Sequence, residues 1–134
     1  MQRSLHPIHS VLLAGTIPLF IGGLLSDVAY FNTYQVQWKN FASWLIVGGL
    51  VFSGFALLWA LIELPRVATR GVQKASLPVL LLIMWVLGLI NAFVHAGDAW
   101  ASMPGGLVIS IIVAALAIAT SAFAFRTDRS GAVR

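Results

Sequence analysis

The chain contains no cysteine and few charged side chains. Of its 134 residues, 9% are charged and 60% are hydrophobic, whereas roughly a quarter of the residues of a soluble domain carry a charge. Without cysteine there is no disulfide framework, no thiolate metal site and no cysteine nucleophile. A soluble chain of this length could not bury so much apolar surface. The composition therefore indicates a membrane protein.

The motifs of several common enzyme classes are also missing. The sequence has no phosphate-binding glycine loop, no metalloprotease helix motif and no serine elbow. We interpret Ser26, Ser53 and Ser110 as helix-packing or backbone-bonding residues. A non-catalytic protein is therefore favoured, although an enzyme stays open. The net charge of +4 comes from basic residues in connections and at the tail, so we expect no nucleic-acid partner.

Four apolar runs divide the sequence, at about residues 10–30, 42–64, 77–97 and 106–125. Each is close to the ~20 residues that a membrane-spanning helix needs. The connections between them are short, which makes successive helices antiparallel neighbours. The predicted fold class is all-α, an integral membrane four-helix bundle with up-down-up-down topology. No linker or change in composition divides the chain, so we expect a single domain over residues 1–134.

The basic residues predict how the bundle is oriented. Cytoplasmic loops of membrane proteins carry an excess of lysine and arginine. Only Lys39 lies on the side of the first and third connections. The other seven basic residues lie with the termini or in the second connection: Arg3, Arg66, Arg70, Lys74, Arg126, Arg129 and Arg134. Both termini are therefore expected in the cytoplasm.

One group of polar residues interrupts the apolar runs on the outer side. Asn91, His95 and Asp98 are spaced i, i+4 and i+7, so they share one face of a helix. Asp27 lies near the same side, at the end of the first run. Polar groups in lipid need partners, so we expect these four residues to meet if the first and third helices approach. They could form a hydrogen-bonded staple between helices, or a site for a proton, a metal or another ligand.

A second polar group lies on the cytoplasmic side. His6 and His9 flank Pro7 before the first run, and Glu63 and Arg66 close the second run. Two imidazoles and a carboxylate suit a divalent metal. Alternatively, the histidines cap the helix or contact lipid headgroups, and Glu63 pairs with Arg66.

Haem b is a further cofactor that the histidines could bind. His9 and His95 belong to opposite ends of the bundle, roughly 25 Å apart at ~1.5 Å per residue. One iron therefore cannot take both as ligands within one chain. His6 with His9, or two copies of the chain in an oligomer, could supply the two ligands.

Several of these residues together resemble a known family. They are the opening Leu5-His6-Pro7-Ile8-His9, Asp27 with Tyr30 three residues later, Glu63, and Asn91, His95 and Asp98 in the third run. The chain resembles, over nearly its whole length, the bacterial membrane proteins of domain-of-unknown-function family 2231. The resemblance implies a multi-pass protein of the bacterial inner membrane and a periplasmic or membrane redox partner.

Three functions remain open from the sequence. The leading prediction is a non-catalytic membrane subunit that docks or serves a partner complex. The second is a haem- or quinone-linked electron-transfer protein associated with a periplasmic dehydrogenase. The third is a small proton-coupled transporter or channel, in which Asp27 and His95 would carry the proton.

Overall fold

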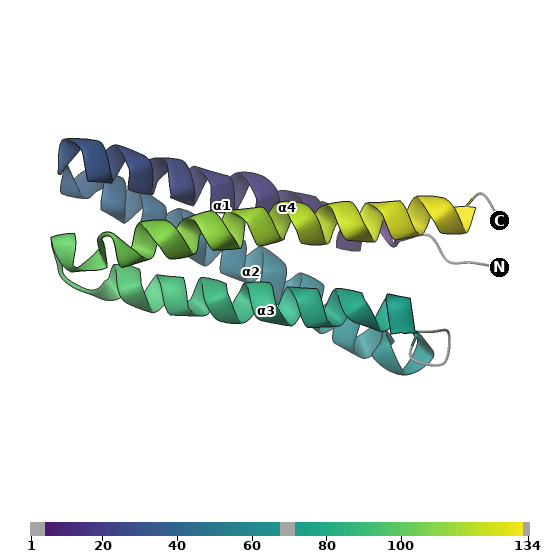
Figure 1. Cartoon of the computed structure of the whole chain (residues 1–134). Helices are drawn as coiled ribbons and strands as arrows, with labels where there is room; N and C mark the ends of the chain where they lie inside the picture. The colour runs from purple at the N-terminus through teal and green to yellow at the C-terminus, as the bar shows by residue number, and fades with distance from the viewer. Residues whose placement is uncertain (1–4, 68–71, 133–134) are drawn as a thin grey trace.

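Four long antiparallel helices form the protein. The computed structural model describes residues 5–67 and 72–132, and within them no residue is in a strand. The elements are α1 (Pro7–Thr33), α2 (Val36–Val67), α3 (Val72–Ala96), the short 3₁₀ helix η2 (Ala99–Ser102) and α4 (Gly105–Ala132) (Figure 1). Each long helix packs on two neighbours, in the cyclic order α1, α2, α3, α4. The predicted all-α four-helix bundle is confirmed, and each of its helices is long and apolar enough to span a membrane.

The helices are longer than most of the apolar runs that predict them. α1 continues to Thr33 and α2 begins at Val36, so only two residues connect these helices. α1 ends where Tyr34 adopts a left-handed conformation, with φ 59°, and donates its N–H to the Tyr30 carbonyl. Asn32 and Thr33 bond to carbonyls one turn back. The length of an apolar run predicts only the part of a helix that lies in the hydrocarbon core. Final turns made of polar residues extend the helix beyond that run.

The start of α1 and the end of α4 lie together at one end of the bundle, which we call the terminal end (Figure 1). There the Leu5 N–H donates to Asp128 Oδ1 over 2.7 Å. The opposite end, where α1 meets α2 and η2 precedes α4, is the distal end. The predicted cytoplasmic location of the terminal end stays a prediction. Of the basic residues on which it depends, Arg3, Arg70, Arg134 and the side chain of Lys74 lie outside the described residues.

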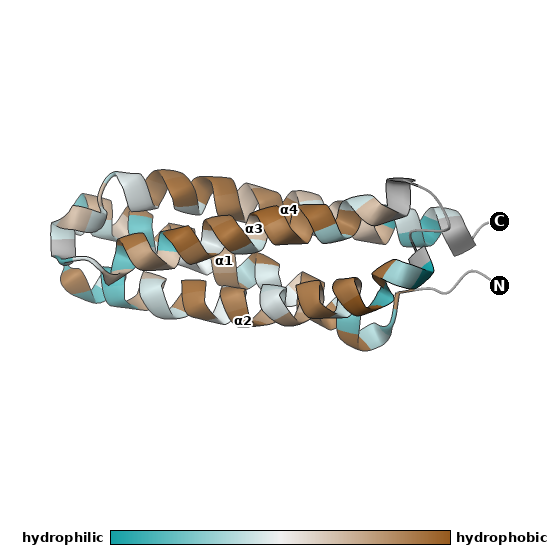
Figure 2. Cartoon of the chain, turned by 90° about the horizontal axis from the view of Figure 1, so that it is seen from below, coloured by the Kyte–Doolittle hydropathy of each residue, from teal (hydrophilic) through white to brown (hydrophobic). Residues whose placement is uncertain are grey.

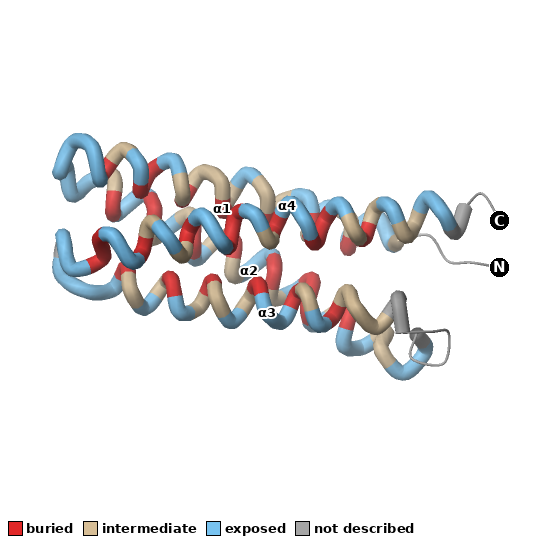
Figure 3. Tube along the Cα trace, viewed as in Figure 1, coloured by how far each residue is buried: buried red, intermediate tan, exposed pale blue. Residues whose placement is uncertain are grey.

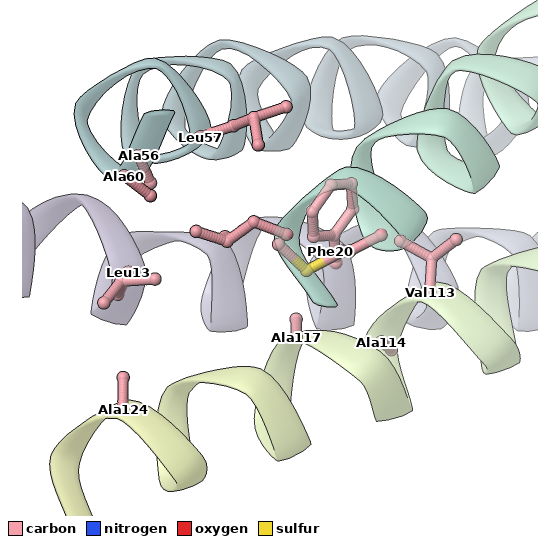
Figure 4. Packing of buried hydrophobic residues seen from close by; sticks show 11 residues of the cluster. Leu13, Phe20, Ala56, Leu57, Ala60, Val113, Ala114, Ala117 and Ala124 are labelled. Atoms are coloured by element: carbon pink, nitrogen blue, oxygen red, sulfur yellow. The ribbon is translucent and has the colours of Figure 1, made fainter. Parts of the chain in front are cut away.

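The interior is built on one face of α1. Its buried residues include Leu13, Thr16, Phe20 and Gly23, spaced alternately by three and four as in left-handed bundles. Figure 4 shows Leu13 and Phe20 among small and branched residues of α2 and α4. Phe20 occupies the space that Gly49 leaves on α2, where an added Cβ would lie 2.6 Å from the Phe20 ring. The middle of the bundle is therefore tightly packed.

The outer surface suits lipid. Hydrophobic residues cover the middle of the helices, and polar residues gather toward their ends (Figure 2). Exposed positions run along the outside of all four helices (Figure 3). Some of the largest exposed apolar side chains, with 63–76% of their surface accessible, are Val11, Leu25, Trp44, Ile62 and Phe93. A water-soluble monomer rarely exposes so much apolar surface, so these side chains contact the lipid bilayer.

Candidate functional site

A buried polar cluster lies between three helices near the distal end. Asp27 of α1, Asn91 and His95 of α3, and Ser110 of α4 meet there, and each is 0–3% exposed. We call these four residues the distal polar cluster. From the sequence, Asp27, Asn91 and His95 are expected to meet if the first and third helices approach. Instead, α1 and α3 are not packing neighbours in the bundle, and the Asp27 and His95 side chains meet across its interior.

Gly106 makes room for this crossing. A Cβ added at Gly106 would lie 2.8 Å from Cε1 of His95, closer than van der Waals contact allows. A side chain on α4 at this position would therefore push the imidazole away from Asp27. By contrast, a Cβ at the neighbouring Gly105 would meet nothing within 4 Å.

Hydrogen bonds join the four residues into a closed circuit. His95 Nε2 lies 2.7 Å from Asp27 Oδ1, and His95 Nδ1 lies 2.9 Å from the Asn91 carbonyl oxygen. The Ser110 hydroxyl donates to Asp27 Oδ2 over 2.5 Å and accepts from Asn91 Nδ2 over 2.8 Å. The hydrogen bonds thus run from the side-chain amide of Asn91 through Ser110, Asp27 and His95 back to the backbone carbonyl of Asn91. Each link holds its neighbour's orientation, so the carboxylate and the imidazole face each other in a fixed geometry.

This circuit specifies how many protons the pair holds. The Asn91 carbonyl can only accept, so the hydrogen bond at Nδ1 requires a proton on that nitrogen. Nε2 then needs a second proton between itself and Asp27 Oδ1, because a nitrogen lone pair and a carboxylate oxygen at 2.7 Å would repel each other. With that proton, the Asp27–His95 pair has no net charge, whether the proton lies on nitrogen or on oxygen. The hydrogen bonds therefore account for one proton at Nδ1 and one proton between Nε2 and Asp27 Oδ1.

The same geometry differs from that of a serine hydrolase. In a catalytic triad, the serine hydroxyl bonds to imidazole and the carboxylate supports the far side of the ring. Here the Ser110 hydroxyl bonds to the carboxylate of Asp27. Imidazole therefore cannot take the serine proton in this arrangement, and Ser110 is a donor that holds Asp27.

Two features close the bundle above this cluster at the distal end. Lys39 of α2, only 9% exposed, donates from Nζ to the carbonyl of Gly97, two residues beyond His95. The rings of Tyr30, Phe31 and Tyr34 surround Trp100, with centroid distances of 5.6, 5.9 and 4.7 Å. Tyr30 lies one turn beyond Asp27 on α1. Tyr30 and Lys39 are buried, whereas Phe31, Tyr34 and Trp100 are exposed.

The structure changes the membership of the cluster predicted from the sequence. Asp27, Asn91 and His95 come together, but Asp98 does not. The helix that would place Asp98 on the same face ends at Ala96, and Asp98 is exposed at the start of η2. Ser110 was missed, because its interpretation as an ordinary packing serine is the usual one for a spanning helix.

The residues predicted at the terminal end are arranged differently. Exposed His6 caps α1, since its Nδ1 accepts the N–H of Ile8 over 3.3 Å. His9 is buried, and both imidazoles lie against Trp59 of α2, with ring centroids 4.9 and 6.0 Å away. Glu63 is half-buried and Arg66 is exposed. Across the described residues, no three histidine or acidic side chains are placed to hold a metal ion.

His95 is not placed to bind a haem together with His9. Both ring nitrogens of His95 already face hydrogen-bond partners in the distal polar cluster. His9 lies 18 residues before Asp27 on α1, which is about 27 Å along the helix at ~1.5 Å per residue. Haem ligation by His95 would require the Asp27–His95 pair to open.

Fold and surface together define an integral membrane protein with four spanning helices. The model of domain-of-unknown-function family 2231, described as a predicted membrane protein, matches residues 5–128. The chain belongs to this family. No match to the chain was found among the curated proteins or among the solved structures.

Proposed function

We propose that this protein is a small proton-coupled transporter or channel, in which the Asp27–His95 pair binds and releases the proton. The observation that supports the proposal is a 2.7 Å contact between two titratable side chains that are both fully buried. Ionisable residues within membrane helices are costly and typically belong to ion or proton pathways. The pair alternates between a state with one shared proton and no net charge, and a state with one negative charge.

A purely structural role explains the pair less well. Buried ion pairs are often no more stabilising than well-packed apolar residues of similar size. Hydroxyl and amide side chains can join membrane helices without a titratable group. The rest of the bundle uses such bonds, as where Ser121 of α4 donates to the Leu13 carbonyl of α1 over 3.1 Å. The presence of both a carboxyl and an imidazole therefore favours proton binding.

The membrane and the orientation belong to the same proposal. Arg66 at the end of α2, and Arg126 and Arg129 at the end of α4, lie at the terminal end, while Lys39 lies at the distal end. By the distribution of positive charge, we assign the terminal end to the cytoplasm and the pair to the outer half of a bacterial inner membrane. Partner docking and electron transfer stay predictions, and no contact between described residues favours either.

Proton flux into liposomes tests the proposal directly. The purified protein is reconstituted with a pH-sensitive dye inside, and a potassium gradient with valinomycin drives protons inward. Asp27→Asn and His95→Gln are expected to reduce flux to the rate of protein-free vesicles. The matched control is Asp98→Asn, which removes an exposed acid at the same end and is expected to retain the wild-type rate. Wild-type flux from Asp27→Asn, or no flux from the wild type, would contradict the proposal.

A further inference from the structure

Among the described residues outside the distal polar cluster, His9 is the most deeply buried titratable one. It is 1% exposed, and neither of its ring nitrogens has a hydrogen-bond partner in good geometry among the described residues. A neutral imidazole carries one donor and one acceptor, and each buried polar group without a partner costs about 1–3 kcal/mol. Apolar packing alone therefore does not explain a histidine at this position.

Groups of α2 surround the His9 ring. The ring stacks on Trp59 at an interplanar angle of 25°, and an aromatic face attracts a cation. Burial of the ring favours its neutral form, whereas the Glu63 carboxylate and the Ala56 carbonyl favour the protonated form. These groups come from α2, so one neighbouring helix supplies an aromatic face, a carbonyl and a carboxylate.

Charges from the other elements complete this end of the bundle. His6 precedes His9 by three residues and lies on the same Trp59 ring. Further described charged residues at the terminal end are Arg66 of α2, and Arg126, Asp128 and Arg129 of α4. Asp128 is bonded to the Leu5 N–H. Residues 75–94 of α3 carry no charged or titratable side chain, so this segment adds no charge near His9.

His9 lies close to the terminal end of the bundle. It is in the first turn of α1, three residues after exposed His6. Toward the distal end, α1 presents Leu13, Thr16 and Phe20 to the interior. The Thr16 hydroxyl is bonded to the Leu13 carbonyl, and the Phe20 ring fills the gap at Gly49. No hydrogen bond among the described residues links His9 to the distal polar cluster.

We infer that His9 is a second proton-binding site, which exchanges its proton with water at the terminal end of the bundle and not with the Asp27–His95 pair. Water entering beside His6 and Glu63 supplies the partner that the His9 ring lacks. The inference goes beyond the proposed function, because either site can bind a proton without the other. The two sites lie at opposite ends of the bundle, and the Leu13 and Phe20 side chains lie between them.

Nitrogen-15 spectra of the full chain in lipid nanodiscs test this inference. The histidine rings are labelled and recorded from mildly acidic to mildly alkaline pH, with His6→Gln and His95→Gln used to assign the three rings. His9 is expected to pass between protonated and neutral forms within this range. Glu63→Gln is expected to reduce the protonated fraction of His9 at a given pH, since it removes a nearby negative charge. It is expected to leave the His95 signals unchanged.

A fourth variant distinguishes this inference from the proposed function. Asp27→Asn alters the His95 signals if the distal pair binds a proton, and the inference requires that His9 titrate as before. A His9 ring that stays neutral throughout the range in the wild type would overturn the inference. So would loss of the His9 titration in Asp27→Asn. Neither result bears on the His95 signals, which report on the proposed function separately.

Discussion

The two ends of this bundle each bury a histidine, and they treat it in opposite ways. At the distal end, both ring nitrogens of His95 face protein groups within 2.9 Å. At the terminal end, His9 is equally buried but has no hydrogen-bond partner for either nitrogen among the described residues. The comparison indicates that a partner built into the protein holds a proton in place, whereas a histidine without one depends on water for exchange.

The largest effect is expected from breaking the distal pair. Asp27→Ala leaves the His95 ring and the Ser110 hydroxyl without their shared partner. Removing one member of a buried pair costs about 3–5 kcal/mol. Denaturant unfolding in mixed micelles measures the loss, with exposed Asp98→Ala as the control, expected within about 0.5 kcal/mol of wild type. A similar small change for Asp27→Ala would show that the pair contributes little to the fold.

The second effect comes from crowding the His95 ring without removing a polar group. Gly106→Ala places a Cβ 2.8 Å from Cε1 of His95, and overpacking of this kind typically costs about 1–3 kcal/mol. Gly105→Ala is the matched control, because a Cβ there meets nothing within 4 Å. Both variants are compared by thermal unfolding and by proton flux. Equal effects of the two substitutions would contradict the close contact between position 106 and the His95 ring.

The third prediction compares Ser110 of the distal polar cluster with Ser26, an ordinary serine within a helix. Ser110→Ala removes the donor to Asp27 and the acceptor of Asn91, and leaving buried polar groups unpaired costs about 1–3 kcal/mol. Ser26→Ala removes only a bond to the Gly22 carbonyl in the same helix, for which about 0.6 kcal/mol is a typical value. The same unfolding assay ranks the two. Equal losses would mean that Ser110 is only a packing residue.

The smallest effect extends the comparison to buried hydroxyls. Thr16 donates to the Leu13 carbonyl over 2.6 Å, whereas the equally buried Thr120 has no partner for its hydroxyl among the described residues. Thr16→Val is expected to lose about 0.6 kcal/mol. Thr120→Val is expected to change stability by less than that, or to increase it. A larger loss at Thr120 would reveal an internal water bound to its hydroxyl.

The sequence predicts the helices well, because apolar runs of spanning length have few other solutions in a membrane. It also identifies Asp27, Asn91 and His95, since an acid and a spaced pair of polar residues in apolar runs need partners. Asp98 was predicted with them on helical spacing alone. Helical spacing does not apply to Asp98, because α3 ends at Ala96.

Two other features of the site cannot be obtained from the sequence. Ser110 looks like the other helix serines until α4 is placed beside Asp27, because serine has no periodic or compositional signal of its own in a membrane helix. The terminal histidines illustrate the converse. Their spacing suits a metal, but His6 is exposed and caps the helix while His9 is buried, since α1 already begins at Pro7.

The central claim is that one proton lies between Asp27 and His95, and the nitrogen-15 spectrum of the His95 ring at neutral pH tests it most directly. The account predicts a proton on Nδ1, and a second proton on the link between Nε2 and Asp27 that disappears in Asp27→Asn. A His95 ring that is neutral, with Nδ1 unprotonated and a spectrum unaffected by Asp27→Asn, would contradict the account.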